Sequence, residues 1–175
     1  KTSLARVISN TTKYKFTKLN AVTAGVGDIK NAIEEAKNPF LNPSGRCILF
    51  IDEIHRFNKL QQDALLPYVE NGTVILIGAT TENPYFEVNK ALISRSMVFK
   101  LKPLSVENIF TILKNAIKNP EGLGSYNINI EDETLKKIAE ISNGDVRTAL
   151  NSLEIAVLTT PVDKNGLINI TNEIA

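Results

Sequence analysis

Two short apolar runs dominate the hydrophobic pattern of this chain. Residues 47–51 are five consecutive apolar side chains, and residues 73–77 form a second, almost uninterrupted apolar segment. Runs of this length between turn-forming residues are typical of strands buried on both faces of a sheet. Two further strands are predicted at residues 14–19, where aromatic or apolar side chains alternate with polar ones, and at residues 97–101.

Segments with apolar residues at helical spacing separate these strands. Such helices are predicted at residues 1–8, 29–36, 59–70 and 91–95. Asp28 is expected to cap the second of them, and Pro67 to kink or shorten the third. Because buried strands alternate with amphipathic helices, the fold class is α/β, with a parallel, doubly wound sheet flanked by helices.

The pattern changes after Pro103, beyond which no strong strand is predicted. Three amphipathic helices follow, at residues 106–118, 133–142 and 146–158. Gly144 is expected to end the second of them and Asp145 to cap the third. We therefore predict two domains, an α/β core at residues 1–102 and a small all-helical domain at residues 103–175.

Composition narrows the function classes only slightly. Among 175 residues there are one Cys and one His, which excludes an internal disulfide and leaves too few ligands for a zinc site. Cys47, at the start of a buried strand, is expected to serve packing. A net charge of +1 neither supports nor excludes a nucleic-acid partner. The apolar runs are too short to span a membrane and no secretory signal is evident, so we expect a cytoplasmic protein without a membrane partner.

Two adjacent acids, Asp52 and Glu53, follow the first apolar run directly. In a parallel sheet they would lie at the carboxyl edge of the strands, where ligands of this fold class bind. Asp52 could hold Mg²⁺ through its water shell, while Glu53 could polarise a water for attack on a phosphate. This is the Walker B pattern of a nucleotide triphosphatase. The alternative is a buried strand that runs into a solvated acidic turn.

The chain opens on Lys1 and Thr2, without an initiator Met. If a glycine-rich segment stood upstream, these residues would complete the phosphate-binding motif G-x-x-x-x-G-K-[ST]. Lys1 would then reach the β- and γ-phosphates, and the Thr2 hydroxyl would ligate Mg²⁺. The alternative is an ordinary start of a helix.

Other candidates sit at the ends of predicted elements. Thr80 and Thr81 follow the second apolar run and could sense a γ-phosphate or its attacking water, although a threonine-rich turn is an equal alternative. Arg95 ends a short helix, where an arginine is usually a solvated cap. Arg147 lies beside the buried stripe of the last helix, and could point at a neighbouring domain or be a surface charge.

The order of these motifs is more informative than any one of them. Lys1-Thr2, then DEIHRF, GATT, LISR and GDVR together resemble an AAA+ ATPase of the clamp-loader clade. More narrowly, DEIHRFNK with QQD at residues 61–63, followed by GATTENP, is similar to the RarA/MgsA family of replication-associated recombination ATPases. The resemblance extends over essentially the whole chain. It implies a P-loop NTPase core followed by a helical lid.

The resemblance implies ATP and Mg²⁺ as ligands. Lys1 and Thr2 would form the tail of Walker A, with Thr2 on the metal. Asp52 would be the Walker B metal ligand, largely through water, and Glu53 the catalytic base.

Further roles are implied at the ends of the elements. Thr81 would be the sensor-1 residue, with Thr80 as the alternative. Arg95 matches the arginine finger, which this family offers to the nucleotide of the neighbouring subunit, and Arg147 matches sensor 2, which reaches the γ-phosphate from the lid. His55 is expected to belong to the helix entry of the motif rather than to catalysis.

The function implied by the resemblance is that of a DNA-dependent ATPase in replication-fork maintenance and recombination. Its partners would be DNA at single-strand/double-strand junctions or ends, further copies of the chain, and single-strand-binding protein or other replisome components, with a nucleoid-associated location in a bacterium. One alternative is a non-hydrolysing clamp-loader-like subunit that contributes Arg95 to a partner. Intact Asp52, Glu53 and Thr81 argue against it. Another is a RuvB-like branch-migration motor, which shares DEIHR and GATT but not the continuation ENP at residues 82–84.

Some parts of the family pattern are not in the sequence. These are the glycine-rich part of Walker A, the first strand of the sheet, the upstream segment that touches adenine and the C-terminal oligomerisation region. The missing strand would lie between the strands predicted at residues 73–77 and 97–101. We therefore expect the chain to be a piece of a longer polypeptide.

Overall fold

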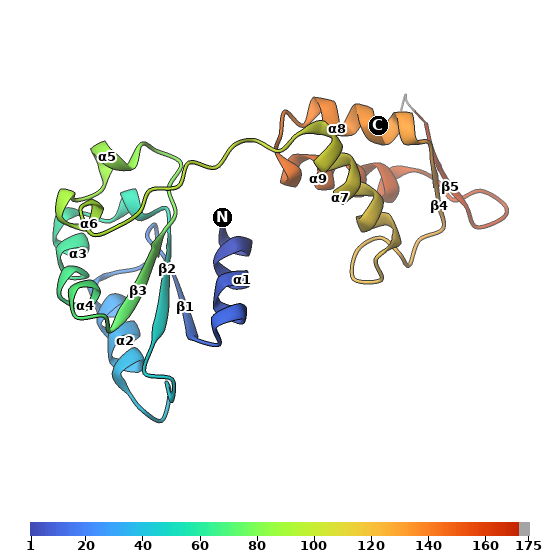
Figure 1. The fold of residues 1–175 in the computed structure, drawn as a ribbon. Coiled ribbons are helices and arrows are strands. Elements are labelled where there is room, and N and C mark those ends of the chain that lie inside the picture. Colours follow the sequence, from blue (N-terminus) through green and yellow to red (C-terminus); the bar gives the residue numbers. More distant parts are fainter. Residues whose placement is uncertain (172–175) are drawn as a thin grey trace. The chain divides into compact units, whose positions relative to one another are not determined.

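The computed structural model describes residues 1–171, which form two compact units (Figure 1). The first unit is Lys1–Phe99, and the second starts at Lys100. The assignment of residues 1–102 to a nucleotide-binding core and 103–175 to a lid stays a prediction, and the last four residues of that range lie outside the described residues. Among the described residues, no helix combines the length and apolar character needed to cross a membrane.

The first unit is built on a parallel sheet, as predicted. Its three strands are β1 (Lys15–Asn20), β2 (Cys47–Asp52) and β3 (Val74–Gly78), in the order β1-β2-β3. The register pairs Asn20 with Asp52 and Ile51 with Gly78. The three carboxyl ends therefore meet at one edge of the sheet.

The side chains of the central strand β2 point alternately to the two faces of the sheet. Since they are apolar on both faces, a helix covers each face. On one side Phe50 packs with residues of α1 (Thr2–Thr12) and stacks on Phe16, with ring centroids 6.2 Å apart. On the other side Leu49 and Ile51 join a larger core with α2 (Val26–Lys37). Figure 1 shows α1 on one side of the sheet and α2 on the other. All residues of β2 except Asp52 are buried, which fixes the position of the acids that follow.

The predicted capping role of Asp28 needs a correction. Gly25 occupies the N-cap position of α2, and Asp28 is the third helical residue. The Asp28 carboxylate accepts a hydrogen bond of 2.8 Å from the backbone N–H of Gly25. Val26 and Gly27 already have helical backbone, so the helix starts earlier than the apolar spacing indicated.

The helix predicted at residues 59–70 is broken in two. Its parts are α3 (Lys59–Asp63) and α4 (Leu66–Glu70), and Pro67 stands in the first turn of α4. Proline lacks the N–H that a continuous helix would use, so the interruption just before it agrees with the predicted kink. Two more short helices follow β3, α5 (Pro84–Glu87) and α6 (Lys90–Ile93).

The prediction of a strand at residues 97–101 is wrong. These residues form no helix or strand, and Met97, Phe99 and Leu101 are all more than half exposed. A strand needs a neighbour for its backbone N–H and C=O groups. Within the described residues β3 pairs only with β2, so no strand is present beside residues 97–101.

The second unit contains the three predicted helices. They are α7 (Val106–Lys118), α8 (Asp132–Ile141) and α9 (Val146–Thr159), and they pack around a common core. Gly144 has a φ of +83°, and the Asp145 carboxylate accepts a hydrogen bond of 2.9 Å from the Arg147 N–H. The predicted stop and cap between α8 and α9 are therefore present.

The prediction of an all-helical second unit needs a correction. Two three-residue strands, β4 (Ile128–Ile130) and β5 (Ile168–Ile170), pair in parallel. Ile168 and Ile170 are buried in the helical core, while Asn129 donates a 2.8 Å hydrogen bond to Asn169 on the other face. Three residues give too short an alternation to stand out in the sequence.

Candidate functional site

The carboxyl edge of the sheet gathers the acids and the start of the chain. Asp52 is the last residue of β2, and its Oδ2 lies 3.5 Å from the Thr2 hydroxyl and 3.8 Å from Lys18 Nζ. A carboxylate and a hydroxyl this close suit a shared Mg²⁺, which takes few protein ligands and keeps several waters. No group of three or more His, Cys, Asp or Glu that could hold a metal occurs within residues 1–171. The donor set present therefore fits an ion that phosphate and water also ligate.

Lys1 reaches the end of the neighbouring strand. Its ammonium donates a 2.5 Å hydrogen bond to the backbone carbonyl of Thr80, two residues beyond β3. Lys1 and Thr2 also begin α1, whose N-terminal N–H groups carry partial positive charge. A cation, the contact between Thr2 and Asp52, and the start of a helix thus lie at one edge, an arrangement that suits a phosphate.

Glu53 adopts an unusual backbone conformation. It has φ 53° and ψ 46°, the left-handed region that residues with a Cβ seldom occupy. The next residue, Ile54, donates its N–H to the Ala79 carbonyl at 2.9 Å and begins a short 3₁₀ helix, η1 (Ile54–Arg56). The sharp turn therefore ties the end of β2 to the end of β3 and directs the Glu53 side chain toward the loop after β3.

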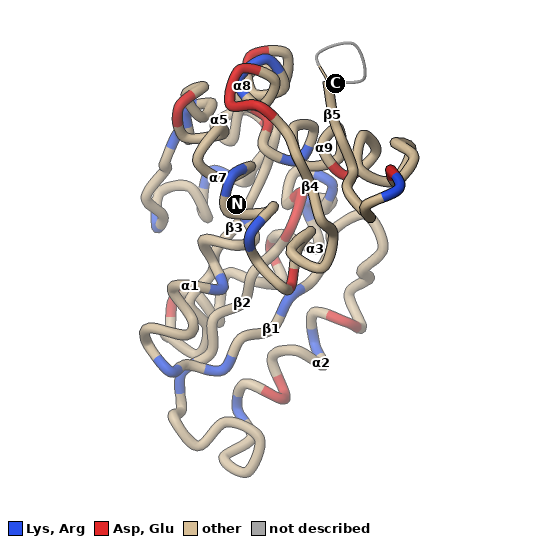
Figure 2. The backbone as a smooth tube through the Cα atoms, turned by 90° about the vertical axis from the view of Figure 1, so that its right-hand side faces the viewer, with Lys and Arg blue, Asp and Glu red and all other residues tan. Residues whose placement is uncertain are grey.

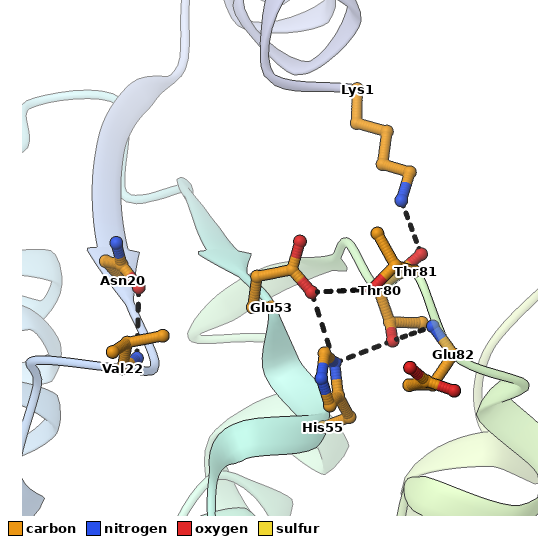
Figure 3. A network of polar contacts seen from close by, with 8 residues as sticks. All are labelled: Lys1, Asn20, Val22, Glu53, His55, Thr80, Thr81 and Glu82. Carbon is orange, nitrogen blue, oxygen red and sulfur yellow. Dashed lines mark hydrogen bonds and ion pairs between the residues drawn. The ribbon is translucent and has the colours of Figure 1, made fainter.

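A polar network surrounds the Glu53 carboxylate (Figure 3). The Thr81 hydroxyl donates to Glu53 Oε2 at 3.2 Å, and His55 Nδ1 lies 3.3 Å from the same oxygen. The same Nδ1 is 2.8 Å from the Thr80 hydroxyl, which accepts a 3.0 Å hydrogen bond from the Glu82 N–H. The carboxylate is thus held through one oxygen and remains about one-third exposed. Such a group can accept a proton from a bound water.

Cys47 lies at the opposite end of β2 from the acids. Burial raises the pKa of its thiol above the ordinary value, although hydrogen bonding with Thr17 acts in the other direction. Its Sγ is 3.7 Å from the Thr17 hydroxyl. This environment suits a packing residue, as predicted, rather than a nucleophile.

Arg95 lies apart from this network, just after α6. Its Nη1 donates to the Ala91 carbonyl at 2.9 Å and to the Ser94 hydroxyl at 3.1 Å, while Nη2 forms a 2.7 Å ion pair with Glu70 of α4. The structure therefore holds the guanidinium on the α4–α6 side of the first unit.

Arg147 belongs to the first turn of α9 in the second unit, where its side chain is exposed. Its backbone N–H is used by the Asp145 cap. An approach of its guanidinium to a nucleotide stays a prediction.

Sequence reasoning did not identify several residues at this edge. Asn20 is in register with Asp52, and Lys18 reaches the Asp52 carboxylate. Both stand at the end of a predicted strand parallel to β2, so the rule that located the acids could have located them. His55 was expected only to begin a helix, whereas the structure brings its ring against Glu53.

Basic and acidic residues are mixed along two of the helices. Figure 2 shows basic and acidic positions alternating along α2 and α8, in agreement with the sequence of these helices. The charges of α2 and α8 therefore single out neither helix as a surface for DNA.

Two protein families match separate parts of the chain. Residues 1–104 match the ATPase family associated with various cellular activities (AAA), and residues 124–175 match the AAA C-terminal domain. Among curated proteins, the replication-associated recombination protein A of Escherichia coli K12 is 49% identical over 95% of this chain. The protein of that name from Bacillus subtilis is 47% identical over 100% of the chain. The chain spans 37% and 41% of the lengths of these two relatives.

Solved structures share the fold. The Holliday junction branch migration motor RuvB of Thermotoga maritima has a TM-score of 0.76 and 25% identity, and covers 99% of this chain and 55% of its own. The parallel sheet with flanking helices is thus a known arrangement of mixed α/β type.

Proposed function

This chain belongs to the AAA family of ATPases, and from that membership we propose that it hydrolyses ATP within a longer protein that acts on DNA in replication-associated recombination. The observation that carries the proposal is the meeting of Thr2, Asp52, Glu53 and Thr81 at one edge of the sheet. The names of the relatives at 47–49% identity support the biological setting. The chain spans about two-fifths of the length of those relatives, and the proposed activity is that of a protein of their full length.

Each residue at the edge has a separate task in the proposed reaction. Thr2 and Asp52 would hold Mg²⁺, which supplies neutralising charge for the phosphates of ATP. The Lys1 ammonium would bind the β- and γ-phosphates, exchanging its present carbonyl acceptor for them. Glu53 would take a proton from the attacking water.

Thr81 is preferred to Thr80 as the sensor-1 residue. The Thr81 hydroxyl contacts the Glu53 carboxylate directly. The Thr80 hydroxyl is instead engaged with His55 and with the Glu82 N–H. A hydroxyl beside the base is better placed to respond to the attacking water.

Two arginines would stabilise the charge of the transition state. Arg95 would be supplied to the nucleotide of a neighbouring subunit in a homo-oligomer, and Arg147 would come from the lid. Guanidinium groups suit this task because they stay charged and bind phosphate oxygens in pairs. Turnover would then depend on how subunits and domains are arranged.

The names of the same relatives support a setting in replication and recombination. We propose single-strand/double-strand DNA junctions or ends as the nucleic-acid partner, contacts with single-strand-binding protein or other replisome components, and a cytoplasmic, nucleoid-associated location.

A RuvB-like branch-migration motor is the second candidate, because the RuvB structure aligns with 99% of the chain. The identity of 25% to that structure is well below the 49% to replication-associated recombination protein A, which favours the first proposal. A non-hydrolysing subunit would not need the base and the metal ligands together.

The proposal is tested by Glu53→Gln in the full-length protein. We expect turnover to fall by about 10²-fold or more, because the amide cannot accept the proton, while ATP binding is kept. Steady-state phosphate release, with and without DNA that carries a single-strand gap, measures the effect. Wild-type turnover should rise with this DNA.

The matched control is Glu82→Gln, which makes the same chemical change on an exposed side chain of the adjacent loop. Only the backbone N–H of Glu82 takes part in the network, so its turnover should match the wild type. Full activity of Glu53→Gln would refute the assignment of the base. Absence of stimulation by DNA would refute the nucleic-acid part alone.

A further inference from the structure

The contacts of His55 give this residue a task that its place in the sequence did not suggest. We propose that His55 is a positioning residue that aims the Glu53 carboxylate at its water, an inference that rests on the proposed role of Glu53 as base. The imidazole stands between the end of β2 and the loop after β3, where Figure 3 shows it between Glu53 and Thr80. Its side chain is only 8% exposed, against 33% for Glu53. A nearly buried ring therefore supports a more exposed carboxylate.

The proton on His55 can be assigned from its neighbours. Nδ1 lies 3.3 Å from Glu53 Oε2, and an ionised carboxylate oxygen can only accept a hydrogen bond. The contact is attractive only if Nδ1 carries hydrogen, so the ring is in the Nδ1–H form. That N–H can donate to the Thr80 hydroxyl oxygen, 2.8 Å away, and its positive end then lies beside Glu53 Oε2.

The Thr80 hydroxyl fixes the ring in turn. Its oxygen accepts from the Glu82 backbone N–H at 3.0 Å and, in this assignment, from His55 Nδ1–H. The Thr80 carbonyl is bonded to Lys1. Because a backbone group anchors the hydroxyl, the imidazole has a rigid support rather than a mobile one.

Both contacts to the base converge on one oxygen. Thr81 and His55 each contact Glu53 Oε2, and Oε1 forms no hydrogen bond within the described residues. With Oε2 held twice, rotation of the carboxylate is restricted and Oε1 is left to receive the proton. Loss of the His55 contact leaves only the single 3.2 Å bond from Thr81.

The test compares two variants of the full-length protein that differ in one donor. His55→Asn places an amide N–H near the position of Nδ1, whereas His55→Leu has similar bulk and no donor. We expect His55→Leu to lower kcat by about 10- to 100-fold, with the KM for ATP nearly unchanged. His55→Asn should recover most of the lost kcat, which a purely structural role would not explain.

A spectroscopic measurement on the wild type is independent of the stability of the variants. The imidazole ¹⁵N signals of His55, identified by their loss in His55→Asn, should report the Nδ1–H form. The Nε2–H form would overturn the proposal. So would equal losses of kcat in His55→Leu and His55→Asn.

Glu53→Gln, measured in parallel, distinguishes a wrong role for His55 from a wrong role for Glu53. If Glu53→Gln is inactive and His55→Leu is fully active, the role of His55 is wrong and the proposed function stands. If Glu53→Gln is fully active, the assignment of the base itself is wrong.

Discussion

At the scale of single residues, the packing behind Glu53 is as important as the polar contacts in front of it. Ile54, which follows Glu53, is buried and packs against Gly78 at the end of β3. A Cβ at position 78 would lie 3.0 Å from Ile54 Cδ1 and 3.2 Å from its Cγ2. Gly78 therefore lets Ile54 approach β3, and Ile54 in turn sets the turn at Glu53.

Gly78→Ala should lower both stability and turnover. The added methyl group overpacks the site by an amount that typically costs about 1–3 kcal/mol, and the displaced Ile54 shifts Glu53. Chemical denaturation and steady-state ATPase assays measure the two effects. Gly27→Ala is the control, because no atom lies within 4 Å of its Cβ and alanine favours a helix. Wild-type stability and kcat in Gly78→Ala would show that Ile54 moves aside freely.

The sequence was sufficient to place Asp52 and Glu53, because acids after a buried strand must emerge at the edge of a parallel sheet. It was not sufficient to place His55. The direction of that ring depends on the left-handed backbone of Glu53, and no local preference of a glutamate indicates such a conformation. Residues fixed by periodicity were therefore predictable, and residues fixed by one irregular dihedral angle were not.

At the scale of secondary-structure elements, the connection between α8 and α9 is closely packed. Gly144 has φ +83°, and a Cβ there would lie 2.5 Å from Pro103 Cβ. Its carbonyl also accepts a 3.3 Å hydrogen bond from the Leu104 N–H. The glycine thus ends α8 and also allows the segment before α7 to pack against this turn.

Gly144→Ala should destabilise the second unit by more than the roughly 1–2 kcal/mol that left-handed backbone alone costs a residue with a Cβ. Gly166→Ala is a matched control, since Gly166 has φ +80° and no atom within 4 Å of its Cβ. The difference between the two free energies of unfolding, or between their hydrogen-exchange protections, isolates the clash with Pro103 and the Leu104 backbone. Equal losses would show that Pro103 and Leu104 move aside without a cost in stability.

Helices were predicted better than strands at this scale. The helix α7 (Val106–Lys118) has the bounds that its apolar spacing indicated, because thirteen residues repeat the helical period several times. The strands β4 and β5 have three residues each, and pair with a segment forty positions away in the chain. Their existence depends on tertiary contact, which local sequence patterns do not encode.

At the scale of the whole molecule, the proposed partner of Arg95 lies in another copy of the chain. Its guanidinium is now paired with Glu70, and both side chains are close to half exposed. An exposed ion pair of this kind contributes little to stability, so it can open when a stronger anion is offered. The ion pair with Glu70 therefore does not prevent Arg95 from binding a nucleotide of a neighbouring subunit.

Complementation between inactive variants tests that role. Arg95→Ala and Glu53→Gln should each be inactive in the full-length protein while keeping ATP binding. Subunits mixed in equal amounts before assembly should recover up to roughly a quarter of the wild-type turnover, because some interfaces then combine an intact base with a neighbour's arginine. A mixture of Glu53→Gln with the double variant Glu53→Gln/Arg95→Ala is the control, because no subunit in it has an intact base and no turnover is expected. No recovery would place the action of Arg95 within its own subunit.

The left-handed backbone of Glu53 has a consequence for selection. In that conformation glycine or asparagine would be less strained than glutamate, so the stability of the fold alone favours a different residue at this position. At this position a residue that makes the fold more stable would remove the proposed base, so stability and activity favour different residues. A screen that rewards only folding would favour inactive protein at position 53, whereas selection for turnover retains the strained glutamate.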